Sequence, residues 1–130
     1  MINYSHTKEV KTRIEKRYRN RKGPRGDRPV FAGHPGGQLP IDMAPGAFPA
    51  TIEEQTRKSL ENCKAVLEAS GATMENVIKT TVFLSDMNNF AAMNGVYATF
   101  FAGDHPARSA VEVARLPKDA LVEIECIAVL

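Results

Sequence analysis

Two charged residues near the carboxyl end of the chain could act together on a small organic acid. Arg108 opens a predicted strand, where its planar guanidinium could bind a carboxylate through two parallel hydrogen bonds. Glu123 lies among apolar residues in the next predicted strand, where its carboxylate is suited to accept and return protons. The same pattern also fits a structural ion pair between Arg108 and Glu123, or a solvated stripe of Glu123 and Glu125.

The sequence supports other kinds of catalysis only weakly. The three histidines, His6, His34 and His105, fall in loop-like contexts, and we expect them to be structural or solvent-facing. Ser109 has no histidine at a useful spacing, so we do not expect a serine nucleophile. The sequence contains no phosphate-binding loop and no metal-ligand cluster, and we therefore expect no metal site.

The elements that must position Arg108 and Glu123 can be predicted from residue 51 onward. Thr51 and Glu54 have the spacing of a capping box, apolar residues then recur at helical spacing, and Gly71 ends the segment. Asp86 is predicted to cap a second helix, whose buried side is marked by Phe90, Met93, Tyr97 and Phe100 or Phe101. The predicted order is helix, strand, helix, strand, strand, over residues 52–70, 77–84, 87–102, 109–115 and 121–129.

This order of elements predicts an α+β domain. A strand–helix–strand crossover next to a hairpin, whose turn would lie at 116–119, implies a mixed sheet with both helices on one face. In the last strand, one side would carry Leu121, Glu123, Glu125, Ile127 and Val129, and this side is not polar enough to face water alone. We therefore expect copies of the chain to associate through this bare face.

Charge divides the 130-residue chain into two parts. Residues 1–28 carry ten Lys and Arg against three Asp and Glu, whereas residues 29–130 carry seven against twelve. Only Val30–Ala32 in the first 36 residues could form a short strand. The chain has no apolar run long enough to span a membrane and no secretory leader, so we expect a cytoplasmic protein, with Cys63 and Cys126 as reduced apolar residues.

The segment PARSAVEVARLPKDALVEIECIAV at 106–129 resembles the carboxyl-terminal signature of the RidA family of imine deaminases, also called YjgF. GQLPID at 37–42 and the segment 52–101 resemble the same family almost without gaps. The resemblance implies a chorismate-mutase-like α+β homotrimer with clefts between its subunits. It also implies hydrolysis of 2-imino and enamino acids, such as 2-iminobutanoate and 2-iminopropanoate, to 2-keto acids and ammonia without a cofactor.

The resemblance also implies roles for individual residues. Arg108 would bind the substrate carboxylate, and Glu123 would hold the attacking water and transfer its protons. Asn94 would line the cleft from the neighbouring subunit, and the backbone of Gly37 and Ala110 would complete the pocket. Ala110 stands where most relatives have cysteine, and we expect hydrolysis to persist because the backbone at that position matters more than the thiol.

The amino-terminal part departs from the family, which begins with a strand and a motif of the type AP-AIGPYSQA. No such motif precedes GQLPID in frame, but shifting the reading frame of residues 21–34 by one nucleotide can yield EKAPAAIGPYSQA. We therefore expect residues 1–35 of this single domain to be out of frame and residues 36–130 to be family-like. The tyrosine of that motif and the serine before Gly37 are then absent, which weakens the expectation of activity.

A different class of function is a non-catalytic member of the same family that binds small carboxylates or RNA, since some relatives are described as translation inhibitors or ribonucleases. The basic segment 1–28 has the charge of a nucleic-acid site. No aromatic platform for stacking bases accompanies it, however, because Tyr4, Tyr18 and Phe31 fall on no credible sheet. We therefore expect an imino acid as the partner, and neither nucleic acid nor a membrane.

Overall fold

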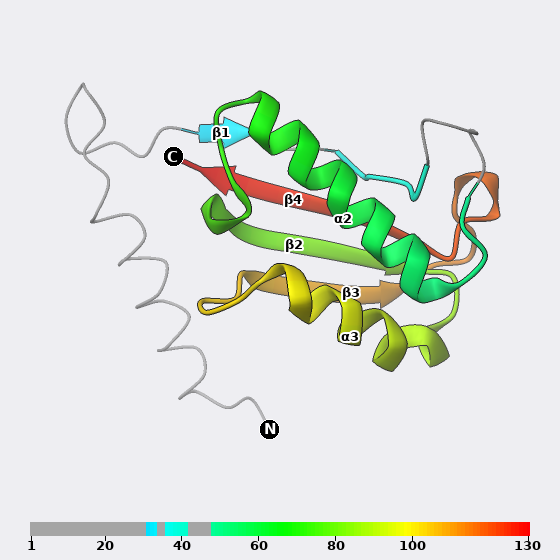
Figure 1. Cartoon of the computed structure of the whole chain (residues 1–130). Helices are drawn as coiled ribbons and strands as arrows, with labels where there is room; N and C mark the ends of the chain where they lie inside the picture. Colours follow the sequence, from blue (N-terminus) through cyan, green and yellow to red (C-terminus); the bar gives the residue numbers. More distant parts are fainter. Residues whose placement is uncertain (1–30, 34–35, 42–47) are drawn as a thin grey trace.

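The computed structural model describes residues 31–33, 36–41 and 48–130. Two helices and four strands make up this part of the chain (Figure 1). In chain order they are β1 (Phe31–Gly33), α2 (Ile52–Ala69), β2 (Val77–Leu84), α3 (Phe90–Phe100), β3 (Ala107–Glu112) and β4 (Val122–Val129), with short 3-10 helices at Met74–Asn76, Met87–Asn89 and Pro117–Asp119.

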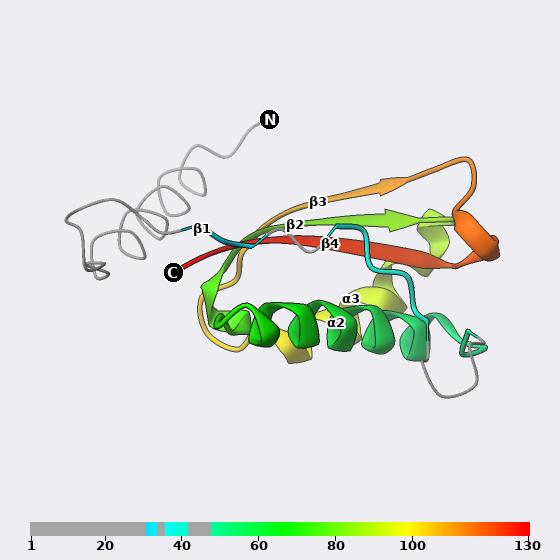
Figure 2. The ribbon, with the colours of Figure 1, turned by 90° about the horizontal axis from the view of Figure 1, so that it is seen from above.

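The strands form one mixed sheet in the order β1-β4-β2-β3. β2 is parallel to β3 and antiparallel to β4, and β1 is antiparallel to β4. Helix α3 makes the crossover that two neighbouring parallel strands require. Both helices lie on one face of the sheet (Figure 2), so the predicted α+β class with a mixed sheet covered on one side is confirmed.

The predicted hairpin of the last two strands is wrong, because β2 lies between β3 and β4. β3 ends at Glu112, and the amide of Val113 donates to the carbonyl of Leu84, the last residue of β2. No stretch of β2 remains beyond Leu84 to pair with residues 113–115, which were predicted to continue the strand. The segment between β3 and β4, which contains the 3-10 turn Pro117–Asp119, instead crosses the end of β2. β4 then pairs with the edge of β2 opposite to β3.

The residues that begin and end helices in the sequence predicted the positions of both helices correctly. The Thr51 hydroxyl accepts a hydrogen bond from the amide of Glu54 at 3.2 Å, and the Glu54 carboxylate accepts one from the amide of Thr51 at 3.3 Å. This is the predicted capping box at the start of α2. Gly71 follows the helix with φ of +80°, a conformation that favours glycine. Asp86 accepts from the amide of Asn88 and caps the 3-10 turn that leads into α3.

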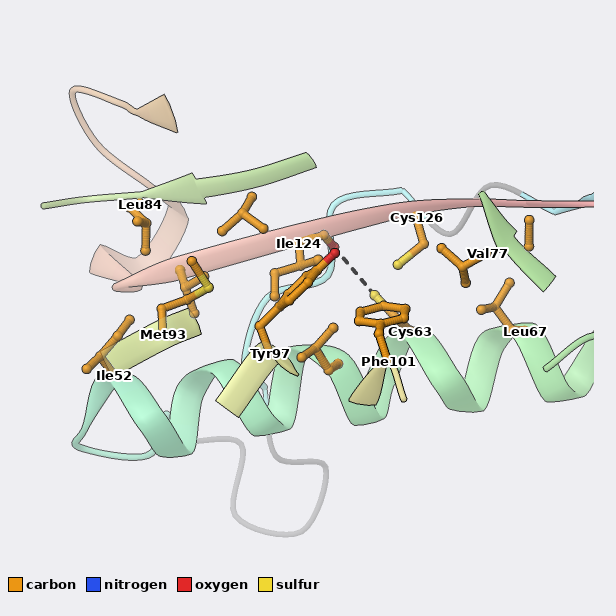
Figure 3. Packing of buried hydrophobic residues seen from close by; sticks show 14 of the residues in the cluster. Ile52, Cys63, Leu67, Val77, Leu84, Met93, Tyr97, Phe101, Ile124 and Cys126 are labelled. Carbon is orange, nitrogen blue, oxygen red and sulfur yellow. Dashed lines mark hydrogen bonds between the residues drawn. The ribbon is translucent and has the colours of Figure 1, made fainter. Parts of the chain in front are cut away.

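The hydrophobic core lies between the helices and the inner face of the sheet (Figure 3). Val122, Ile124 and Cys126 of β4 point into it and are fully buried. Glu123 and Ile127, which alternate with them, are only partly buried on the opposite face. The predicted division of β4 into a covered and a bare side is therefore confirmed, although the assembly expected to cover the bare side stays a prediction.

The predicted strand at 30–32 is confirmed in part, because β1 pairs Phe31 with Val129 of β4, and the expectation that Phe31 falls on no sheet is wrong. Val30 lies outside the described residues, as do residues 1–29, on which most of the out-of-frame interpretation rests. That interpretation stays a prediction. None of the helices in the described part of the chain is long and apolar enough to cross a membrane.

Candidate functional site

Arg108 lies on β3, the strand at one edge of the described sheet, and its side chain faces helix α3. Its Nη1 atom donates a hydrogen bond of 2.6 Å to the amide oxygen of Asn94. The guanidinium carbon lies 4.5 Å from the ring centre of Tyr97 and 5.3 Å from that of Phe90. The rings attract the cation through their faces, so a half-buried arginine is held against one side of α3.

No carboxylate among the described residues forms an ion pair with Arg108. One of its five N–H donors is committed to Asn94, and the guanidinium carbon lies over the rings of Tyr97 and Phe90. The remaining donors can therefore bind a planar anion such as a carboxylate. The interpretation of Arg108 and Glu123 as an ion pair within one chain does not hold in this structure.

Glu123 lies on the other face of the sheet, against the segment that contains Gly37. Two backbone hydrogen bonds between Gln38 and Ile124, of 2.7 and 3.2 Å, hold this segment beside β4. A Cβ atom placed on Gly37 would lie 1.7 Å from the Oε1 atom of Glu123. The Glu123 carboxylate thus occupies the space that any side chain at position 37 would need.

The positions of Arg108 and Glu123 divide the predicted site into two halves. Arg108 is in register with Thr80, which pairs with Cys126, and Glu123 is three residues from Cys126. At about 3.3 Å per residue and about 4.8 Å between strands, their backbones are roughly 10 Å apart along the strands and roughly 10 Å apart across them. Because their side chains also point to opposite faces, one chain does not bring them together.

The remaining predicted residues fall into one or the other half. Ala110 lies two residues beyond Arg108 on the same side of β3 and pairs with Val82. Asn94 contacts Arg108 of its own chain, and its predicted place in the cleft of a neighbouring subunit stays a prediction. One half therefore contains Arg108, Asn94 and Ala110, and the other contains Glu123 and Gly37.

The ring of Tyr97 belongs to the arginine half, although the sequence indicated only a buried residue at this position. Its hydroxyl is 2.7 Å from the hydroxyl of Thr80. Burial raises the pKa of Tyr97, whereas the hydrogen bond to Thr80 and the charge of Arg108 lower it. The net shift is upward, so the side chain is a neutral phenol at neutral pH. The spacing of Phe90, Asn94 and Tyr97 by four and three residues was the available signal for a shared helix side.

Other candidate groups do not form a second site in the described part of the chain. Ser109 accepts a hydrogen bond from the Lys79 ammonium at 2.8 Å on the outer sheet face, and His105 is exposed. His6 and His34 lie outside the described residues. The described residues contain no group of three or more His, Cys, Asp or Glu side chains that could hold a metal ion.

The fold and this site define an α+β protein with a half-buried arginine on an edge strand of the described sheet, without a carboxylate partner among the described residues, and a separate carboxylate on the bare sheet face. The profile of the family described as Endoribonuclease L-PSP matches residues 33–130. The chain belongs to this family, to which its RidA and YjgF relatives also belong, as the sequence signature at 106–129 predicted.

Curated relatives match the chain over nearly three quarters of its length. A RutC family protein of Pyrococcus horikoshii is 58% identical over 93 residues, which cover 71% of this chain and 74% of that protein. The 2-iminobutanoate/2-iminopropanoate deaminase of Escherichia coli is 50% identical over 96 residues, which cover 72% and 75%. Relatives with about 50% to 58% sequence identity are thus named in two ways, some as deaminases and others only by family.

Solved structures share the fold over a still larger part of the chain. The crystal structure of Escherichia coli TdcF with bound serine has 44% sequence identity and a TM-score of 0.73, covering 85% of this chain and 91% of that one. The YjgF gene product of Escherichia coli has 45% identity and a TM-score of 0.73, covering 84% and 90%.

Proposed function

We propose that this protein hydrolyses 2-imino and enamino acids of the 2-aminoacrylate type, including 2-iminobutanoate and 2-iminopropanoate, to 2-keto acids and ammonia. The observation that carries the proposal is Arg108, a half-buried guanidinium with no carboxylate partner among the described residues and with donors left for a planar anion. The relatives named as deaminases, at about 50% identity, support this reaction for a carboxylate-binding member of the family.

The two halves of the site require more than one copy of the chain. Glu123 acts on the substrate of Arg108 only if the bare face of one subunit lies against the β3 edge of another. A cyclic homotrimer, which the family resemblance implies, would repeat this contact three times and form three clefts. The partly buried apolar residue Ile127 on the bare face supports such an interface.

In each cleft, Arg108 of one subunit would bind the substrate carboxylate through two parallel hydrogen bonds, with Asn94 and the backbone of Ala110 beside it. Glu123 of the next subunit, held close to the backbone of Gly37, would accept a proton from a water molecule as the water oxygen attacks the imine carbon. The electron pair of the C=N bond moves to nitrogen, and Glu123 gives that nitrogen the proton taken from water, which leaves a carbon bearing one hydroxyl and one amino group. The hydroxyl proton then passes to the amino group, the C–N bond breaks to release ammonia, and the C=O bond forms.

The test is the rate of 2-keto acid formation when a dehydratase releases the enamine from threonine, measured above the uncatalysed rate. Arg108→Ala is expected to lower kcat/KM about 10- to 150-fold, the equivalent of a charged hydrogen bond of roughly 1.5–3 kcal/mol. Arg108→Lys should recover little, because a point charge does not reproduce two parallel hydrogen bonds. Glu123→Gln should instead lower kcat by about 10²–10⁴ and leave KM nearly unchanged.

Matched controls use charged residues of the surface. Arg115, which pairs with Asp119 at 2.9 Å, and Glu61, which lies 3.9 Å from Lys58, are both exposed. Arg115→Ala and Glu61→Gln should leave the rate unchanged. If the wild-type chain binds pyruvate through Arg108 but does not accelerate 2-keto acid formation, the protein is a carboxylate-binding member without deaminase activity, and the proposed reaction is wrong.

A further inference from the structure

The guanidinium of Arg108 lies over the ring of Tyr97, a residue that has no direct part in the proposed reaction. The ring of Tyr97 lies 4.5 Å from the guanidinium carbon, closer than that of Phe90 at 5.3 Å. Tyr97 itself is only 4% exposed, and its ring packs on Phe101 with 4.8 Å between centres. The ring thus packs in the core on one side (Figure 3) and lies under a charged group on the other.

The hydroxyl of Tyr97 is fixed from the sheet. It lies 2.7 Å from the hydroxyl of Thr80, which is fully buried in the middle of β2. Thr80 is also the register partner of Arg108 on β3. Tyr97 therefore contacts two neighbouring strands: its hydroxyl lies beside Thr80 of β2, and its ring lies beneath the side chain of Arg108 on β3. A rotation of the ring would break the hydrogen bond and withdraw the support from the guanidinium.

We propose that Tyr97, anchored by Thr80, is a positioning residue for Arg108, and that it sets the plane in which the guanidinium presents its donors to the substrate carboxylate. Asn94 holds the Nη1 atom of the guanidinium at 2.6 Å, and the ring of Tyr97 lies 4.5 Å from the guanidinium carbon, so that together they restrict the direction of the free donors. Two parallel hydrogen bonds to a carboxylate need this alignment. The inference rests on the proposed binding of a carboxylate by Arg108.

The alternative is that Tyr97 and Thr80 are a buried polar pair with a structural role alone. A double variant distinguishes the two roles. Replacing both hydroxyl groups of a buried hydrogen bond costs little stability, whereas replacing one of them leaves the other polar group buried without a partner. Tyr97→Phe and Thr80→Val should each destabilise the fold, and the double variant should regain much of that loss. If the pair positions Arg108, the double variant should not regain its affinity for substrate.

The expected kinetic result is a KM for the imino acid about three- to tenfold higher in Tyr97→Phe and in the double variant, with kcat changed much less. In an Arg108→Ala background, Tyr97→Phe should have no further effect on KM, because it acts through the missing guanidinium. Thr56→Val is the matched control, since Thr56 is a fully buried threonine whose hydroxyl donates to the carbonyl of Ile52. It should lower stability and leave KM unchanged.

A second measurement does not depend on turnover. The side-chain Nε–H resonance of Arg108, assigned by its loss in Arg108→Lys, should carry a ring-current shift that changes in Tyr97→Phe and not in Thr56→Val. Pyruvate titrated into the same samples should bind more weakly to Tyr97→Phe. The positioning role is refuted if KM and the resonance are unchanged in the double variant, or if Tyr97→Phe raises KM equally without Arg108. Absence of turnover in the wild type, with pyruvate binding that still depends on Tyr97, would refute the proposed reaction alone.

Discussion

Substitution of Gly37 by alanine should disable Glu123 without unfolding the protein. The added Cβ would lie 1.7 Å from the Oε1 atom of Glu123, 2.6 Å from its carboxyl carbon and 3.1 Å from its Cγ. Carbon and oxygen atoms do not approach closer than about 3.0 Å, so the carboxylate oxygen must retreat by about 1.3 Å. The obstacle is the end of a flexible side chain rather than backbone, so the cost to stability should be small.

The catalytic cost should be much larger, because a misplacement of about 1 Å can lower a rate about 100-fold. We expect Gly37→Ala to lower kcat by about that factor, while KM changes little because Arg108 lies on the other sheet face. The assay is 2-keto acid formation from a dehydratase product. Gly36→Ala is the control, since a Cβ there meets nothing within 4 Å. A Gly37→Ala variant with wild-type kcat would refute the placement of Glu123 in the reaction.

Three further predictions concern the fold and the assembly. Thr51→Ala should lower the free energy of unfolding by about 1 kcal/mol in a denaturant titration, because it removes the capping box of α2; an unchanged value would show that the cap adds nothing. The hydrogen bond with Cys126 and burial raise the pKa of the Cys63 thiol. Since the unfolded thiol ionises near pH 8.5, stability should be intact below that pH and fall above it, and Cys63→Ala should make the fall shallower in titrations from pH 7 to 10; an equal slope would contradict this. Ile127→Glu on the bare face should convert the predicted trimer to smaller species by light scattering, whereas Val66→Glu, at a position 42% exposed on α2, should not; a wild-type monomer would contradict the proposed assembly.

Features that depend on neighbouring residues in the sequence were predicted well. The capping box of Thr51 and Glu54, the glycine stop at Gly71 and the alternation along β4 are set by spacings of a few residues. Such spacings are visible in a sequence, because a helix or strand repeats every few residues. The two helices and the middle strand therefore lie close to where the sequence placed them.

Strand pairing could not be predicted in the same way. The turn at 116–119 favoured a hairpin, but its strands are separated by β2, whose sequence position is more than thirty residues from β4. The order of the strands is set by backbone hydrogen bonds, which every residue type except proline can form, so the side chains do not show which strands pair. A strand pattern predicts that a segment is extended, and it does not name the segment beside it.

The candidate site was predicted residue by residue but not in its arrangement. Arg108 and Glu123 were singled out by their residue types and strand contexts, and the family resemblance gave them roles, but the sequence did not show on which sheet face the Arg108 side chain lies. Opposite faces follow only from the register of three strands. The support of Arg108 by Tyr97 was also missed, because an aromatic residue at helical spacing usually indicates a core position and nothing more.

Complementation between two impaired variants tests most directly whether Arg108 and Glu123 of one cleft come from different subunits. Arg108→Ala and Glu123→Gln chains are unfolded, mixed in equal amounts and refolded, and 2-keto acid formation is compared with each variant refolded alone. In a cyclic trimer assembled at random, about a quarter of the clefts receive both wild-type side chains, so about a quarter of the wild-type rate should return. A mixture no more active than the two variants alone would contradict the shared site.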